Sequence, residues 1–166
     1  MCDEVLIQLR RRSGPPLLTR IDAADLDLVG QHTWSALVMP HTTYARTEIR
    51  VEGRATSLYL HQLLLGCSGA DHIDGNGLNN RRANLRVATS EQNSANRAPL
   101  SGRSSQYKGV GWHRHRGTWQ AYITVHGQQR HLGYFTAEED AALAYDSAAL
   151  ATWGEWAKVN FTRAVV

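Results

Sequence analysis

Cysteine is scarce in this chain of 166 residues, where Cys2 and Cys67 are the only two. Two distant cysteines are weak evidence for a disulfide and too few for a cysteine-rich zinc site, so we expect free thiols and no structural zinc. No stretch approaches the roughly 18 apolar residues of a membrane span. The acids Asp3 and Glu4 argue against a signal peptide. The composition therefore predicts a soluble intracellular protein that is not secreted and has no membrane partner.

Acidic residues are absent between Arg97 and His131, although the whole chain has a net charge of only +3. Lysines, arginines and histidines fill that stretch, and tyrosines and tryptophans are interleaved with them. Cations mixed with aromatic side chains are typical of a surface that binds nucleic acid. The alternative is a solvated face of a small domain, because a charge run alone often means no more than that.

The hydrophobic pattern predicts an α+β protein that begins with a small β-rich platform at residues 1–60. Within the platform we expect a helix at 21–29, capped by Asp22, and strands at 5–10, 33–39, 44–51 and 55–60. Residues 61–97 then follow the order strand, loop, strand, helix after a short apolar helix that Gly66 ends. Residues 98–106 are rich in Pro, Ser and Gly and predict a linker between domains.

Three strands and one helix are expected in the last domain, residues 107–161. The strands are predicted at 107–114, 119–125 and 129–135, with the turns at Gly117 and Gly127. Thr136 begins a capping-box pattern, which opens an alanine-rich helix that runs to about Trp153. A three-stranded antiparallel sheet packed on one helix leaves its other face open, and we expect that open face to carry Arg and Trp.

Asp71 and His72 form a carboxylate–imidazole pair on a predicted strand. Adjacent strand residues point to opposite faces, so one could face a metal ion and the other the attacking water. A neutral imidazole can activate water, and a divalent ion can hold a phosphate and its leaving oxygen. Asn93 on the following helix could supply a second oxygen, and such a sparse oxygen set favours one Mg²⁺ or Mn²⁺ over Zn²⁺. The pattern predicts phosphodiester hydrolysis; ordinary turn chemistry is the alternative.

The segment from His61 to Asn96 resembles the HNH (ββα-metal) nucleases, in the subgroup of phage intron and free-standing homing endonucleases. The resemblance implies that His72 is the general base and Asp71 a metal ligand. It also implies that Asn84 braces the strand that carries the base, and that Asn93 completes the metal site. Many HNH nucleases carry His at that last position, where this chain has Asn; Asn96 is the alternative ligand.

Four further basic residues of this segment each have two alternative roles. His61 matches an upstream histidine of the subgroup and would either brace the fold or contact phosphate. Three arginines would either line the DNA backbone or simply be solvated: Arg81, Arg82 and Arg86.

Residues 107–161 resemble the plant APETALA/ethylene-response-factor DNA-binding domain. Five blocks match in order: Tyr107–Val110, Trp119–Ile123, Leu132–Phe135, Ala144–Ala149 and Asn160–Phe161. The resemblance implies a sheet laid in the major groove, where Arg and Trp read the bases. The candidates by position are Lys108, Trp112, Arg114, Arg116, Trp119 and Arg130. Gly111 stands where plant members usually carry Arg, so base preference does not transfer.

Together these resemblances imply a site-specific DNA endonuclease of the homing type, from a phage or mobile element, that acts on double-stranded DNA in the cytoplasm of a bacterial or phage-infected cell. With one active site per chain, a monomer would nick one strand, and a double-strand break would need a homodimer or a second event. The alternative is a DNA-binding transcription regulator with an inactive HNH module. An RNA-processing role has no motif in its favour.

Overall fold

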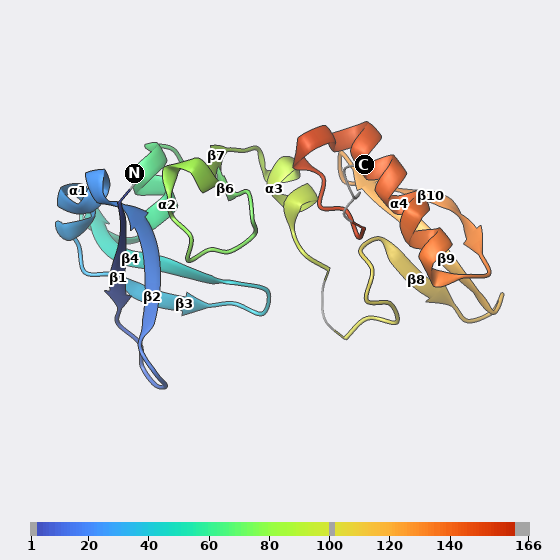
Figure 1. Cartoon of the computed structure of the whole chain (residues 1–166), viewed down its shortest axis with the longest axis horizontal. Helices are drawn as coiled ribbons and strands as arrows, with labels where there is room; N and C mark the ends of the chain where they lie inside the picture. Colours follow the sequence, from blue (N-terminus) through green and yellow to red (C-terminus); the bar gives the residue numbers. More distant parts are fainter. Residues whose placement is uncertain (1–2, 100–101, 162–166) are drawn as a thin grey trace. The chain divides into compact units, whose positions relative to one another are not determined.

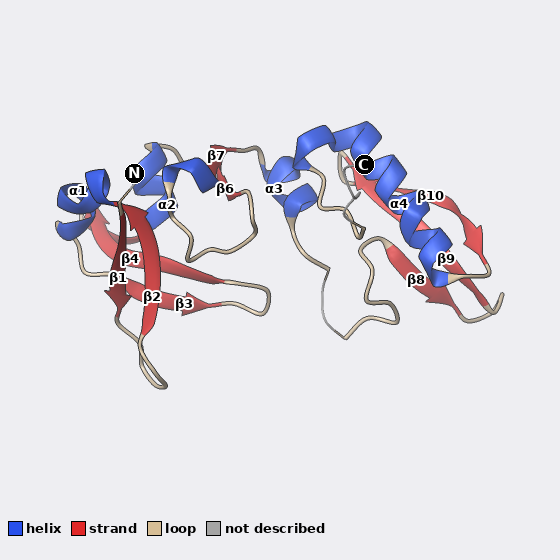
Figure 2. Ribbon diagram, in the orientation of Figure 1, coloured by secondary structure: helices blue, strands red, loops and turns tan. Residues whose placement is uncertain are grey.

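The computed structural model describes residues 3–99 and 102–161 and confirms the α+β class (Figures 1 and 2). Cys2 and part of the predicted linker at 98–106 lie outside these residues. The chain divides into two compact units, Met1–Thr89 and Ser90–Val166. The division falls before the predicted linker, so the helix at 90–96 groups with the second unit. The assignment of 61–97 to one nuclease module stays a prediction.

Two small antiparallel sheets form the platform of the first unit. Strand β1 (Glu4–Leu9) pairs with β2 (Leu17–Asp22), and a second sheet contains β3 (Ser35–Val38), β4 (Thr43–Val51) and β5 (Arg54–Tyr59). Glu52 and Gly53 connect β4 to β5 with φ angles of 50° and 77°. A tight hairpin turn requires such left-handed backbone, which Gly adopts at no steric cost.

The helix predicted for residues 21–29 is wrong in its first part. Ile21 and Asp22 end β2, and only then do a 3₁₀ turn, η1 (Ala23–Asp25), and helix α1 (Leu26–Gly30) follow. Thr19 and Ile21 are fully buried whereas Leu18 and Arg20 are exposed, which is the period of two expected of a half-buried strand. Asp22 makes no capping hydrogen bond from its side chain, so the predicted cap is also wrong.

The Asp71–His72 pair lies on a short antiparallel ribbon of the first unit. Strand β6 (Ala70–His72) pairs with β7 (Leu85–Val87), with His72 opposite Leu85. Helix α2 (Leu60–Leu65) precedes this ribbon and ends at Gly66, whose φ is 67°, as the apolar run predicted. One core contains residues from α2, β7 and the platform: Leu9, Ile21, Val29, Trp34, Ala45, Leu60, Leu64 and Leu85. The ribbon is therefore anchored on the platform.

The second unit packs one long helix on a three-stranded sheet. It contains α3 (Ser90–Asn96), β8 (Val110–His113), β9 (Thr118–Val125), β10 (Gln128–Phe135), α4 (Glu138–Trp153) and the 3₁₀ turn η3 (Gly154–Trp156), with strand order β10-β9-β8. Ala141 and Ala142 of α4 pack on Val110 and Ala121, so small side chains allow the close approach of helix to sheet. The capping box at Thr136 does not form, because Ala137 is the N-cap and makes no side-chain cap bond. Within the described residues, no helix is long and apolar enough to cross a membrane.

The sheet face that α4 leaves uncovered does not carry the expected Arg and Trp. Trp112 pairs with Trp119, and Arg130 pairs with Ile123, which places these side chains on the α4 side of the sheet. The opposite face, here called the open face, carries Gly111, His113, Gln120, Tyr122, His131 and Tyr134. Aromatic, imidazole and amide groups therefore replace the predicted arginines and tryptophans.

Candidate functional site

His72 ends β6 as a buried imidazole, 5% exposed. Its Nε2 lies 3.1 Å from Oδ1 of Asn80, and its ring meets the edge of His61 at a centroid distance of 4.9 Å. Burial lowers the pKa of His72 from its usual 6.5, although the Asn80 hydrogen bond and the Asp74 and Asp71 carboxylates raise it. The ring is therefore neutral near pH 7, which is the form a general base requires.

Asp71 makes a different set of contacts from its neighbour, as the alternation of strand residues predicts. Its Oδ2 accepts a hydrogen bond from Nε of Arg86 at 3.0 Å, and the Arg86 Nη2 lies 2.9 Å away. Both side chains are largely buried, at 5% and 15% exposed. Arg86 is thus paired with the predicted metal ligand, and a divalent ion at Asp71 would share the carboxylate with this guanidinium.

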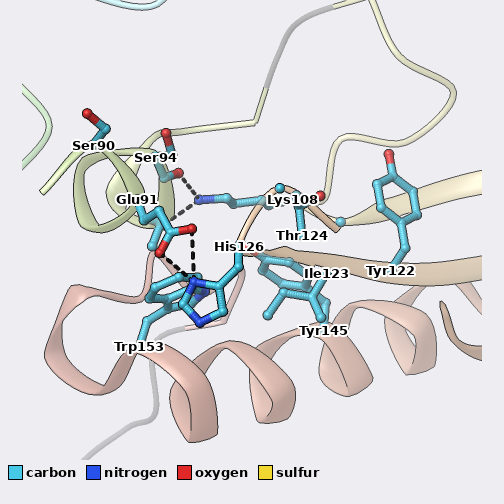
Figure 3. A pocket seen from close by; sticks show the side chains of 13 residues that line it. Ser90, Glu91, Ser94, Lys108, Tyr122, Ile123, Thr124, His126, Tyr145 and Trp153 are labelled. Carbon is cyan, nitrogen blue, oxygen red and sulfur yellow. Dashed lines mark hydrogen bonds and ion pairs between the residues drawn. The ribbon is translucent and has the colours of Figure 1, made fainter. Parts of the chain in front are cut away.

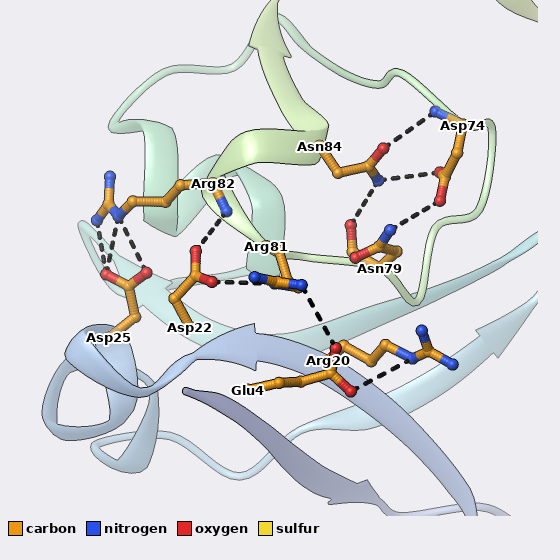
Figure 4. A network of polar contacts seen from close by, with 9 residues as sticks. All are labelled: Glu4, Arg20, Asp22, Asp25, Asp74, Asn79, Arg81, Arg82 and Asn84. Carbon is orange, nitrogen blue, oxygen red and sulfur yellow. Dashed lines mark hydrogen bonds and ion pairs between the residues drawn. The ribbon is translucent and has the colours of Figure 1, made fainter. Parts of the chain in front are cut away.

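Asn84 holds the loop that follows His72 (Figure 4). Its backbone carbonyl accepts a hydrogen bond from Ile73 N at 2.9 Å, and its Oδ1 accepts one from Asp74 N at 3.1 Å. Its Nδ2 donates to Asp74 Oδ1 at 2.9 Å and to Asn79 O at 2.8 Å. These bonds join both ends of the 74–84 loop, a geometry that fits the bracing role expected of Asn84.

Asp74 is held as a carboxylate within this loop. Burial opposes its ionisation, but hydrogen bonds from the Asn79 side chain, the Asn76 backbone and the Asn84 side chain outweigh that penalty. The pKa of Asp74 is consequently lowered from 3.8. A negative charge therefore persists beside His72 across the neutral pH range.

Arg81 and Arg82 are engaged by acids of the platform (Figure 4). Arg82 Nε and Nη2 bind the Asp25 carboxylate at 2.7–3.0 Å, and its Nη1 donates to Leu64 O at 3.1 Å. Arg81 pairs with Asp22 at 3.1 Å. The pKa of Arg82 is raised by its hydrogen bonds to Asp25. These contacts fasten the loop to β2 and η1, so neither arginine is simply solvated.

His61 is a buried ring of α2, 8% exposed, between Tyr59 and His72. It stacks on Tyr59 at a centroid distance of 5.4 Å, and its Nδ1 has no hydrogen-bond partner. Burial, with a further contribution from the charge of His72, lowers the pKa of His61 from 6.5 to about 3. A neutral ring in aromatic packing favours the bracing role over phosphate contact.

The predicted helix ligands belong to the second unit, so the complete metal set stays a prediction. Asn93 is half-buried and Asn96 is 7% exposed, both on α3. In the described residues, no three His, Cys, Asp or Glu side chains gather as a metal centre. The ligand atoms that remain are carboxylate and amide oxygens, which suit Mg²⁺ or Mn²⁺.

Sequence reasoning missed Asn80, the hydrogen-bond partner of His72. Asn80 is fully buried, and its Nδ2 donates to Oγ1 of Thr19 at 2.8 Å and to Gly77 O at 3.2 Å. In the sequence Asn80 is one of several asparagines in a loop, where turn chemistry is the ordinary interpretation. The buried Asn80 amide bonds to Thr19, which lies 61 positions earlier in the chain, and no local sequence pattern reveals that contact.

The predicted DNA-contacting residues of the second unit divide into exposed and packed groups. Arg114 and Arg116 lie exposed in the β8–β9 turn, and Arg116 sits over the Tyr134 ring at 4.5 Å. Trp112 is 40% exposed and contacts the half-buried Trp119 edge-on, with ring centroids 5.0 Å apart. Arg130 is exposed on β10. Of these candidates, Arg116 is thus an exposed cation that contacts the open face, through Tyr134.

Lys108, whose side chain reaches α3 in Figure 3, is half-buried and does not lie on a strand, because β8 begins only at Val110. Its Nζ donates to Ser94 O at 3.2 Å and also to Ala95 O, two carbonyls in the last turn of α3. Burial, with contributions from the charges of Arg97 and Lys158, lowers the pKa of Lys108 to about 8. The ammonium therefore caps the C-terminus of α3, where helix carbonyls lack partners.

The segment that contains Asp71 and His72 matches a known protein family. Residues 70–95 match the HNH endonuclease family. The match includes Asp71, His72, Asn84 and Asn93, and it supports a nuclease. A protein of Acanthamoeba polyphaga mimivirus named as an uncharacterized HNH endonuclease is 38% identical over 90 residues, 54% of this chain. Protein 3.8 of Escherichia phage T7 is 39% identical over 62 residues, 37% of this chain.

A second group of relatives comes from plants. The APETALA2-like protein 2 of Oryza sativa subsp. indica is 46% identical over 65 residues, 39% of this chain. This chain spans 15% of the rice protein, 51% of the phage protein and 46% of the mimivirus protein, less than two thirds of each.

Proposed function

We propose that the chain is a metal-dependent endonuclease that cuts double-stranded DNA. The observation that carries the proposal is His72: a neutral, buried imidazole held by Asn80 beside Asp71, inside the segment that matches HNH endonucleases. A neutral imidazole can take the proton from an attacking water, and the mimivirus relative is named an HNH endonuclease.

In this proposal Asp71 and Asn93, with Asn96 as the alternative to Asn93, would hold one Mg²⁺ or Mn²⁺ ion per active site. The bound ion would supply charge stabilisation at the scissile phosphate and its leaving oxygen. His72 accepts the proton of the water, and Asn84 keeps the strand end and the following loop in place. Arg86, which binds Asp71 at 2.9 Å, restrains the carboxylate and supplies positive charge beside the phosphate.

The second unit is proposed to bind the DNA and so choose the site of cutting, as expected of a homing endonuclease. On the open face, Gln120 can bond base edges and Tyr122 can make apolar contacts in the groove, while Arg114 and Arg116 reach phosphates. One active site per chain makes a monomer a nicking enzyme, and a double-strand break then requires a homodimer or a second event.

The alternative is a DNA-binding regulator with an inactive HNH segment, which is supported by plant relatives named AP2-like ethylene-responsive transcription factors. Supercoiled plasmid incubated with Mg²⁺, with Mn²⁺ or with EDTA separates the two functions. We expect nicked or linear products with either ion and none with EDTA. Binding without products in both metals would support the regulator, and products that persist in EDTA would contradict a metal-dependent mechanism.

A further inference from the structure

We infer that Asn80, supported by Thr19, is a positioning residue that keeps the proton of neutral His72 on Nε2. The platform of residues 1–60 would then have a definite task, because Thr19 lies on β2 and Asn80 is held against that strand. The inference rests on the proposed function for its catalytic meaning, since it makes Nδ1 of His72 the nitrogen that accepts the proton of the water.

The direction of the hydrogen bonds follows from two backbone carbonyls, which can only accept. Gly77 O lies 3.2 Å from the amide of Asn80, so the atom that faces it must be the NH₂ group. The Thr19 hydroxyl donates to Leu78 O at 2.9 Å, so its oxygen is left to accept from the same NH₂ group at 2.8 Å. Both contacts assign the amide nitrogen of Asn80 independently of His72.

The remaining atom of the Asn80 amide is therefore the carbonyl oxygen, and it faces Nε2 of His72 at 3.1 Å. A carbonyl oxygen cannot donate, so Nε2 must carry the hydrogen. A neutral imidazole has one N–H and one lone pair, which leaves the lone pair on Nδ1.

Burial prevents water from replacing these bonds. Thr19 and Asn80 have no exposed surface, and His72 is 5% exposed. The backbone fixes the same loop on β2, because Arg20 N donates to Leu78 O and Asn80 N donates to Arg20 O, each at 2.8 Å. A flipped Asn80 amide would set its oxygen against Gly77 O, and a buried polar atom without a partner is costly.

The direct test is the tautomer of His72, read from long-range ¹H–¹⁵N NMR spectra of the full chain at pH 8. We expect the Nε2–H tautomer in the wild type and a shift toward Nδ1–H in Asn80→Leu, which removes the acceptor at similar size. With DNA saturating, Asn80→Leu should cut at least about tenfold more slowly while its DNA affinity stays the same. An Nδ1–H tautomer in the wild type, or an unchanged spectrum and rate in Asn80→Leu, would overturn the inference.

A second pair of variants guards against misfolding of Asn80→Leu. Thr19→Val keeps the shape but removes the hydroxyl, so it should lower the cutting rate severalfold, and Thr19→Ser should restore the rate because it keeps the hydroxyl. Equal cutting rates in Thr19→Val and Thr19→Ser would count against the support that Thr19 gives to Asn80. If the wild type cuts no DNA, the proposed function fails, and the NMR spectrum still decides whether Asn80 fixes the ring.

Discussion

His61→Phe is predicted to remove a large part of the acid sensitivity of the first unit. The folded chain holds His61 neutral with a pKa of about 3, whereas the unfolded chain releases it to its usual 6.5. Between these values the unfolded state binds a proton that the folded state does not, so stability falls as the pH drops from 6.5 toward 3. Each pH unit of that interval costs about 1.4 kcal/mol of stability, so His61 should cost about 2–3 kcal/mol at pH 4.5.

Phenylalanine fits this position because the imidazole Nδ1 has no hydrogen-bond partner to lose. The ring contacts with Tyr59 and His72 can be retained, and the small gain in size should change stability at pH 7.5 by less than about 1.5 kcal/mol. The wild type should therefore lose about 2–3 kcal/mol more than the variant between pH 7.5 and pH 4.5.

Urea unfolding followed by ¹⁹F NMR of fluorotryptophan measures this difference, because Trp34 is the one tryptophan of residues 1–89. His41→Phe is the matched control, since His41 lies in the turn between β3 and β4. Equal pH dependence in His61→Phe and the wild type would refute the burial argument. A cutting rate that falls by orders of magnitude in a stable His61→Phe would count against a purely structural role for this histidine.

Three further predictions test other parts of the structure. Asn84→Asp should destabilise the first unit by about 2–4 kcal/mol, which is more than Asn84→Ala should. The reason is that the new carboxylate would face Asp74 Oδ1, which now lies 2.9 Å from the Asn84 amide nitrogen. A smaller loss in Asn84→Asp than in Asn84→Ala, measured by urea unfolding, would contradict the hydrogen-bond network around Asn84. Gly109→Ala should unfold or strongly destabilise the second unit, because the φ of Gly109 is 75° and a Cβ there would lie 1.9 Å from the Tyr145 ring. Gly117 also has a positive φ, 63°, but a Cβ there would meet open space. Gly117→Ala should therefore lower the stability by only about 1–2 kcal/mol, measured by thermal unfolding. Arg116→Ala should reduce the slope of log affinity against log salt by roughly 1, and an unchanged slope in a binding titration would remove Arg116 from the phosphate contacts.

Local sequence patterns predicted most of the helices and strands, because the formation of these elements depends on residues that are neighbours in the sequence. The elements of this kind are the alternating strand β4, the apolar helix α2 that ends at Gly66, and the three strands of the second unit, β8, β9 and β10. Strand β2 was missed because Ile21 to Val29 also has helical spacing, and the pairing with β1 decides between the two. Pairing is a long-range property that no short window contains.

Long-range contacts also limited the prediction of single site residues. Asp71, His72 and Asn84 could be proposed as site residues because their types and spacing resemble a known motif, and residues 70–95 match the HNH endonuclease family. Asn80 was not, because its importance comes from a bond to Thr19 across 61 positions. The content of the open face was predicted wrongly, because strand register, which pairs Trp112 with Trp119, decides which side chains face α4.

The single-turnover cutting rate of His72→Ala, with saturating double-stranded DNA and Mg²⁺, tests the general-base role of His72 most directly. We expect this variant to bind DNA as the wild type does and to cut at least about a hundredfold more slowly, while His41→Ala cuts at the wild-type rate. Cutting by His72→Ala at the wild-type rate would contradict the assignment of His72 as the general base.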